Sequence, residues 1–101
     1  MPSTHRLFLI GCPMLLAACA NYEEAVECTG VYGAFAEQDS GFVRLQHLAE
    51  SDATKKGRSA GRTTDQIAKD IKAAKYNKRE ELAGQSWRTN RSRGRCDALY
   101  E

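Results

Sequence analysis

Residues 22–51 read YEEAVECTGVYGAFAEQDSGFVRLQHLAES, and this stretch decides the fold. Its apolar positions recur at alternating steps of three and four residues, which is the spacing of an amphipathic helix. The phase continues across Gly41, so the pattern predicts one long or kinked helix, with residues 39–41 as the place where it would otherwise split. The apolar positions include Cys28, Val31, Phe35, Phe42, Leu45 and Ala49.

A polar linker and a second helix are predicted after this stretch. Residues 52–62 have no apolar period and contain KKGRSAGR, whose two glycines and four cationic side chains are typical of a solvated loop. The sequence Thr63-Thr64-Asp65-Gln66 then fits a capping box, in which Thr63 caps the helix and Gln66 reaches back. The helix is expected to run to about Ala83. Its apolar face is formed by Ile67, Ile71, Ala74 and Leu82.

The first 19 residues have the order of an export signal. A basic start at residues 1–6 precedes an apolar run at residues 7–18, which is too short to cross a bilayer because a spanning helix needs about 20 apolar residues. At the end of this run, Leu16-Ala17-Ala18-Cys19 matches a pattern of one aliphatic residue, two small residues and cysteine. These four residues resemble the lipobox of bacterial lipoproteins.

The resemblance implies a lipoprotein signal peptide at residues 1–18 and a small helical periplasmic domain at residues 19–101. In that family the cysteine, here Cys19, is diacylated on its thiol, the signal is cut before it, and the new amine is also acylated. Because Ala20 rather than aspartate follows the cysteine, the resemblance further implies a position in the outer membrane, facing the periplasm.

Ordinary signal cleavage is the alternative to lipidation. Ala18-Cys19-Ala20 also fits the small-x-small pattern of a conventional cleavage site. Cleavage there would release a soluble periplasmic protein that begins at Asn21.

Two of the four cysteines are left for pairing within the domain. Cys12 lies in the signal and Cys19 would carry the lipid, so Cys28 and Cys96 remain, one near each end of the domain. In an oxidising periplasm such a pair most simply forms a disulfide. Two free thiols or a metal pair are less favoured, because the chain has no CxxC spacing and His47 is the only histidine of the domain.

Together these patterns predict an all-α fold. It would be a small hairpin of two antiparallel helices, the first longer than the second, preceded by the signal-peptide helix and with the C-terminal segment tied back by the Cys28–Cys96 bond. The tail, residues 85–101, shows no clear period beyond a short helical turn at residues 97–100. A hairpin of this size has a thin core, so the disulfide and Trp87 are expected to matter to its stability.

Charge is divided between the two halves of the domain. Residues 20–52 hold seven acidic side chains and one basic, a net charge of −6, whereas residues 53–101 hold thirteen basic and six acidic, a net charge of +7. The favoured interpretation is attraction between elements of one domain. The alternative is a basic half that contacts anionic lipid, polysaccharide or a partner protein.

Residue spacing suggests no catalytic, cofactor-binding or metal-binding set. His47 is a lone helical histidine, and such a residue most often lies on the surface or at the edge of a core rather than acting in catalysis. The acidic cluster Glu23, Glu24 and Glu27 is explained by an acidic first helical turn that complements the helix dipole. No zinc spacing occurs.

The most suggestive patch is the segment WRTNRSRGR at residues 87–95. Arginines beside an aromatic ring bind phosphates and stack on bases, but export argues against a nucleic-acid partner, which leaves anionic lipid, polysaccharide or an acidic envelope protein. In the competing interpretation, Trp87 is a core residue that covers the disulfide while the arginines face water or the acidic cluster. The candidate anion-binding residues are Arg88, Arg91, Arg93 and Arg95.

The sequence therefore predicts a protein that is not an enzyme. We expect a small cell-envelope lipoprotein that is attached to the membrane through its N-terminal lipid and acts there as an adaptor or interaction module. The alternative is a secreted, soluble periplasmic binding or inhibitor protein that uses its basic C-terminal segment.

Overall fold

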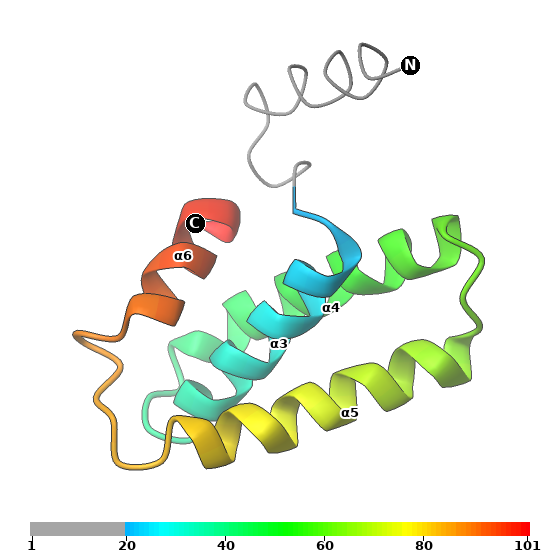
Figure 1. Cartoon of the computed structure of the whole chain (residues 1–101). Helices are drawn as coiled ribbons and strands as arrows, with labels where there is room; N and C mark the ends of the chain where they lie inside the picture. The colour runs from blue at the N-terminus through cyan, green and yellow to red at the C-terminus, as the bar shows by residue number, and fades with distance from the viewer. Residues whose placement is uncertain (1–19) are drawn as a thin grey trace, which may run out of the picture.

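The computed structural model describes residues 20–101, which form four helices and no strand. The all-α fold class is therefore confirmed for this part of the chain. The predicted signal peptide, its helix and the lipidation site Cys19 lie outside the described residues. The helices, labelled in Figure 1, are α3 (Tyr22–Ala36), α4 (Phe42–Ser59), α5 (Thr64–Glu81) and α6 (Arg91–Tyr100).

The prediction of one long first helix is wrong, because the chain reverses at residues 37–41. The carbonyl of Phe35 accepts hydrogen bonds from the backbone N–H groups of Gln38 and Asp39, both at 2.9 Å. The Asp39 carboxylate accepts another from the N–H of Gly41 at 2.8 Å. Helix α4 then runs back antiparallel to α3 (Figure 1), so the two halves of the apolar stripe face each other across a turn. All six predicted stripe positions are buried.

Helix α4 also occupies most of the predicted linker, so that prediction is wrong as well. The buried side of α4 continues in steps of four from Ala49 through Ala53 to Gly57. Gly57 serves close packing rather than flexibility, because a Cβ there would lie 2.7 Å from the side chain of Ile67 and 2.8 Å from that of Tyr22. Gly57 and three of the four cations that suggested a loop, Lys55, Lys56 and Arg58, belong to the last turns of α4, whereas Gly61 and Arg62 follow it.

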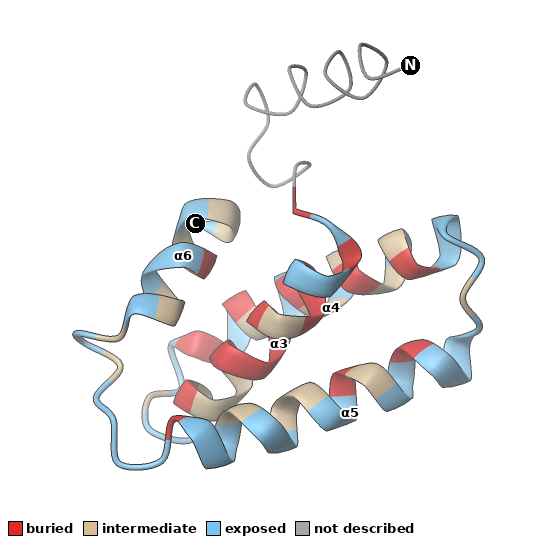
Figure 2. Ribbon diagram, in the orientation of Figure 1, coloured by how far each residue is buried: buried red, intermediate tan, exposed pale blue. Residues whose placement is uncertain are grey.

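Helix α3 is the central helix, with α4 and α5 packed along it (Figure 1). Nine of its fifteen residues are buried, whereas only Ile67 and Ile71 are buried in α5, and Figure 2 shows this concentration of buried positions on α3. The backbones of α3 and α5 come closest at Gly30, where a Cβ would lie 2.6 Å from the carbonyl oxygen of Ala74. Only glycine fits this contact without displacing α5.

The beginning of α5 confirms the predicted capping box. The Gln66 N–H donates to the hydroxyl of Thr63 at 3.1 Å, and the Thr63 N–H donates to the amide oxygen of Gln66 at 2.9 Å. The helix ends at Glu81, slightly before the predicted end. Leu82 follows it and is buried with the core.

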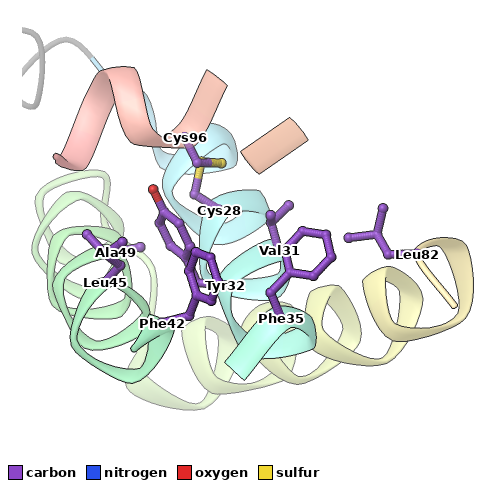
Figure 3. Close-up of a cluster of buried hydrophobic side chains, with 9 residues drawn as sticks. All are labelled: Cys28, Val31, Tyr32, Phe35, Phe42, Leu45, Ala49, Leu82 and Cys96. Atoms are coloured by element: carbon purple, nitrogen blue, oxygen red, sulfur yellow. A yellow bond between two sulfur atoms is a disulfide. The ribbon is translucent and has the colours of Figure 1, made fainter. Parts of the chain in front are cut away.

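Two clusters of buried side chains make up the core. The larger one surrounds Phe42, whose ring centroid lies 6.1 Å from that of Tyr32, 6.0 Å from that of Phe35 and 5.3 Å from that of Trp87. Figure 3 shows this cluster, which consists of Cys28, Val31, Tyr32, Phe35, Phe42, Leu45, Ala49, Leu82 and Cys96. The smaller one, around the start of α3, consists of Tyr22, Ala25, Val26, Ala53, Ile67 and Ile71.

The predicted disulfide is confirmed and joins α3 to α6, with the Cα atoms of Cys28 and Cys96 5.6 Å apart. The prediction of only a short terminal turn in the tail is wrong, because α6 is a ten-residue helix. It begins after Asn90, whose side chain accepts a hydrogen bond from the Arg93 N–H at 3.1 Å. None of the four helices is both long and apolar enough to span a bilayer.

We expect Gly30→Ala to destabilise the protein by about 1–3 kcal/mol, because the new methyl group would collide with the backbone of α5. The matched control is Gly94→Ala in α6, where nothing lies within 4 Å of the added Cβ. The control should be stabilised by up to about 1 kcal/mol, because alanine favours the helix. Urea unfolding followed by circular dichroism measures both, and equal effects would show that α3 and α5 do not approach closely at Gly30.

Candidate functional site

A set of polar contacts fastens α6 onto the other helices beside the disulfide. The hydroxyl of Tyr32, on α3, donates to the Asp97 carboxylate at 2.7 Å, and Arg93 pairs with the same carboxylate at 2.9 Å. On the α4 side, the Tyr100 hydroxyl donates to Asp52 at 2.6 Å. We call these contacts, together with the Cys28–Cys96 bond, the α6 clasp. The sequence analysis missed its polar members, because the tyrosines and their acidic partners are 65 and 48 residues apart.

The clasp protects its two phenols from ionisation. Burial, followed by the hydrogen bond to the Asp97 carboxylate, raises the pKa of Tyr32. Burial and the hydrogen bond to Asp52 likewise raise the pKa of Tyr100. At the other end of α3, burial and a hydrogen bond to Asp70 raise the pKa of Tyr22 to about 12.

The four arginines of the predicted patch do not act as one set, because Arg93 is turned toward the core. Its guanidinium donates to the Trp87 carbonyl at 3.3 Å. It also lies 5.3 Å from the centre of the Trp87 ring and 5.7 Å from that of Phe42. Arg93 therefore helps to hold the segment before α6 in place, and its guanidinium is already paired with Asp97.

The other three arginines are exposed. Arg88 lies over the Trp87 ring, with its guanidinium carbon 4.8 Å from the ring centre. Arg91 and Arg95 are one turn apart on α6, so they lie on the same side of that helix. Arg95 approaches Glu27 of α3 at 3.7 Å, and its side chain is 70% exposed. Trp87 packs against the core cluster that contains Cys28 and Cys96 while three arginines face solvent, as the competing interpretation expects. Anion binding by these three arginines stays a prediction.

Attraction between the two oppositely charged halves of the domain, the interpretation favoured from the sequence, is confirmed. Besides the Lys56–Asp52 pair within α4, five ion pairs join an acid from residues 20–52 to a base from residues 53–101. Lys78 is the least exposed of these bases and pairs with Glu27 at 3.1 Å. The full set is Arg62–Glu23, Lys75–Glu50, Lys78–Glu27, Arg79–Glu37 and Arg95–Glu27.

The remaining candidate side chains occupy surface or capping positions. Glu24 completes a capping box with Asn21, whose side chain accepts the Glu24 N–H at 2.7 Å. Glu23 lies in the same acidic first turn, as predicted. His47 is exposed on α4. Within residues 20–101, no group of three or more histidine, cysteine or acidic side chains is arranged to hold a metal ion.

No known protein family, curated protein or solved structure matches this chain.

Raising the pH above 10 should destabilise the protein through its buried phenols. Their pKa is higher in the folded state than the ordinary value of about 10, so the folded state retains protons that the unfolded state has lost. The contribution of these phenols to the free energy of unfolding is therefore fully present below pH 10. It is lost as the pH rises, at up to about 1.4 kcal/mol per pH unit for each phenol.

Urea unfolding between pH 8 and pH 11.5 measures this loss. Tyr32→Phe should lower the stability at pH 8 and flatten its fall with pH. Tyr76→Phe is the matched control, because Tyr76 is 62% exposed, and it should keep the wild-type slope. If Tyr32→Phe retains the full slope, the Tyr32–Asp97 contact does not protect that phenol.

Proposed function

We propose that this protein is a small cell-envelope lipoprotein that acts as a non-enzymatic interaction module at the membrane surface. Its anchor is lipid attached to Cys19 after removal of residues 1–18. The proposed location is the outer membrane, with the helical domain facing the periplasm. Its partner is an envelope protein or an anionic lipid or polysaccharide.

The start of the domain immediately after the proposed anchor carries this proposal. Asn21 already caps α3, and α3 begins at Tyr22. Only Ala20 separates Cys19 from the cap, and two extended residues span about 7 Å. With no longer spacer, an acyl chain on Cys19 would place the beginning of the central helix against the headgroups. A domain held there is suited to partners that are themselves on or in the membrane.

The covalent structure is consistent with export. Cys28 and Cys96 are 3% and 2% exposed and are joined in a disulfide, which is a feature of proteins that fold in oxidising compartments. An interaction role is further supported by the exposed arginines Arg88, Arg91 and Arg95, which offer cationic contacts to phosphate or carboxylate groups.

A soluble periplasmic binding or inhibitor protein is the second candidate. The small residues on either side of Cys19 favour it, since cleavage after Ala20 would leave the capped helix α3 intact from Asn21 onward. In this case the exposed arginines would be the binding surface for a soluble anionic ligand or enzyme. The two candidates differ in whether Cys19 is retained and acylated.

Intact-mass analysis of the mature protein, combined with membrane fractionation, distinguishes these candidates. We expect the wild-type protein in the membrane fraction with an acylated Cys19, and we expect Cys19→Ser to abolish acylation. Cys12→Ser, in the proposed signal, is the matched control and should leave the anchored product unchanged. A soluble chain that begins at Asn21 would support the periplasmic binder, and an uncut chain would overturn export altogether.

A second measurement tests the exposed arginines. With the disulfide-bonded chain from residue 20 onward, we expect binding to vesicles that contain anionic lipid and a decrease in binding as the salt concentration rises. Replacing Arg88, Arg91 and Arg95 with glutamine should weaken binding by roughly tenfold or more, because each exposed ionic contact contributes up to about 1 kcal/mol.

The matched control for this measurement removes three positive charges elsewhere. Lys55, Arg58 and Lys69 are exposed on α4 and α5, and their replacement by glutamine changes the net charge by the same amount. If the two triple variants lose binding equally, attraction depends on net charge alone. The arginines would then not form a specific surface.

A further inference from the structure

A groove of about 450 Å³ lies along α5 and is bounded on the α4 side by Glu50. Its floor is Ile71, which is 7% exposed, and the exposed Ala68 lies one turn before it at the edge. Tyr76 is 62% exposed, and its ring forms an apolar wall. Helix α5 therefore has an apolar strip on the side that α3 leaves uncovered.

The rim of this groove is cationic. Lys72, Lys75 and Arg79 line it, at positions that follow one side of α5 over two turns. Glu50 is the only acid among the lining residues. A ligand in the groove would therefore meet an apolar floor beneath an excess of positive charge.

The existing ion pairs of the rim are open to competition. Lys75 pairs with Glu50 at 3.6 Å, and both side chains are more than one-third exposed. Arg79 pairs with Glu37 at 2.7 Å, with both side chains more than half exposed. Exposed pairs of this kind contribute little to stability, so a carboxylate from a ligand can replace the internal one at small cost.

We propose that the groove between α4 and α5 binds an acidic amphipathic helix of a partner protein. An apolar side chain of that helix packs between Ile71 and Tyr76, and its carboxylates contact Lys72, Lys75 and Arg79. This inference rests on the interaction function proposed above and specifies the chemistry of the partner. It does not depend on lipidation of Cys19.

The shape and spacing of the groove favour a helix over a flat membrane surface. The apolar floor is recessed beneath a cationic rim, so the headgroups of a bilayer would meet the rim and leave the floor uncovered. The three cations are spread over seven residues of α5, or about 10 Å, which is also the span of two turns in a partner helix. Carboxylates at helical spacing on the partner therefore match them, as in other grooves that bind an amphipathic helix.

Fluorescence anisotropy with a designed peptide tests this proposal. The probe is a labelled helical peptide with leucine every three to four residues and glutamate on both flanks of that stripe. The comparison peptide has the same composition in scrambled order. We expect the purified mature protein, with its disulfide intact, to bind the helical peptide and to bind the scrambled one at least roughly tenfold more weakly.

Charge reversal locates the binding surface. Lys72→Glu combined with Lys75→Glu should weaken binding of the helical peptide by roughly tenfold or more. The matched control is Arg58→Glu combined with Lys69→Glu, two exposed cations that neither line the groove nor belong to the arginine surface, and it should bind within about twofold of wild type. Circular dichroism and thermal unfolding of each variant show whether the fold is retained.

Several outcomes would overturn the proposal. These are no binding at millimolar peptide, equal binding of the scrambled peptide, or an equal loss in the control variant. The same conclusion follows if the groove variant instead loses binding to anionic vesicles, or loses self-association, while peptide binding stays unchanged. Failure of this assay leaves the Cys19 mass and the arginine measurements unaffected, so the two proposals fail separately.

Discussion

The Cys28–Cys96 disulfide attaches α6 firmly to α3, which non-covalent packing alone would not do. This helix has ten residues and a single buried residue, Cys96 itself. An isolated helix of that length is marginal in water. Closing a loop with a sequence separation of 68 residues removes chain entropy from the unfolded state, which corresponds to a stabilisation of about 4 kcal/mol. The hydrogen bonds of Tyr32 and Tyr100 then form between groups that the disulfide already holds close together.

Placing α6 in this way completes the larger core cluster and determines which arginines face solvent. Trp87 precedes α6 and closes the cluster over Phe42. The same placement brings Arg93 over the rings of Trp87 and Phe42, whereas Arg91 and Arg95 remain exposed to solvent. The α4–α5 groove is lined by Glu50 and by residues of α5, and it shares no lining residue with this region. The protein therefore offers two separate cationic surfaces of different character, one exposed and rich in arginine and the other recessed over an apolar floor.

Much of the core could be predicted from the sequence, whereas the path of the chain could not. The predicted burial of the stripe from Cys28 to Ala49 is confirmed, because burial follows the period of the apolar residues. That period continues unchanged through the reversal at residues 37–41, so it could not distinguish one long helix from two antiparallel ones. Gly57 suggested a loop because the sequence does not show that Ile67 and Tyr22 leave no room for a side chain at this position. Arg93 could not be distinguished from the neighbouring arginines in the sequence, because its contacts with Trp87 depend on tertiary packing.

The position of Cys28 on the central helix also has a consequence for the order of folding. Synthesis proceeds from the N-terminus, so Cys28 and the whole of α3 emerge well before their partners in α5 and α6. Until Cys96 follows, Cys28 is an unpaired thiol on a helix whose apolar surface is largely uncovered. Correct oxidation must therefore wait for nearly the whole domain. During that interval, Cys28 is open to premature pairing with another cysteine, including one on a second nascent copy.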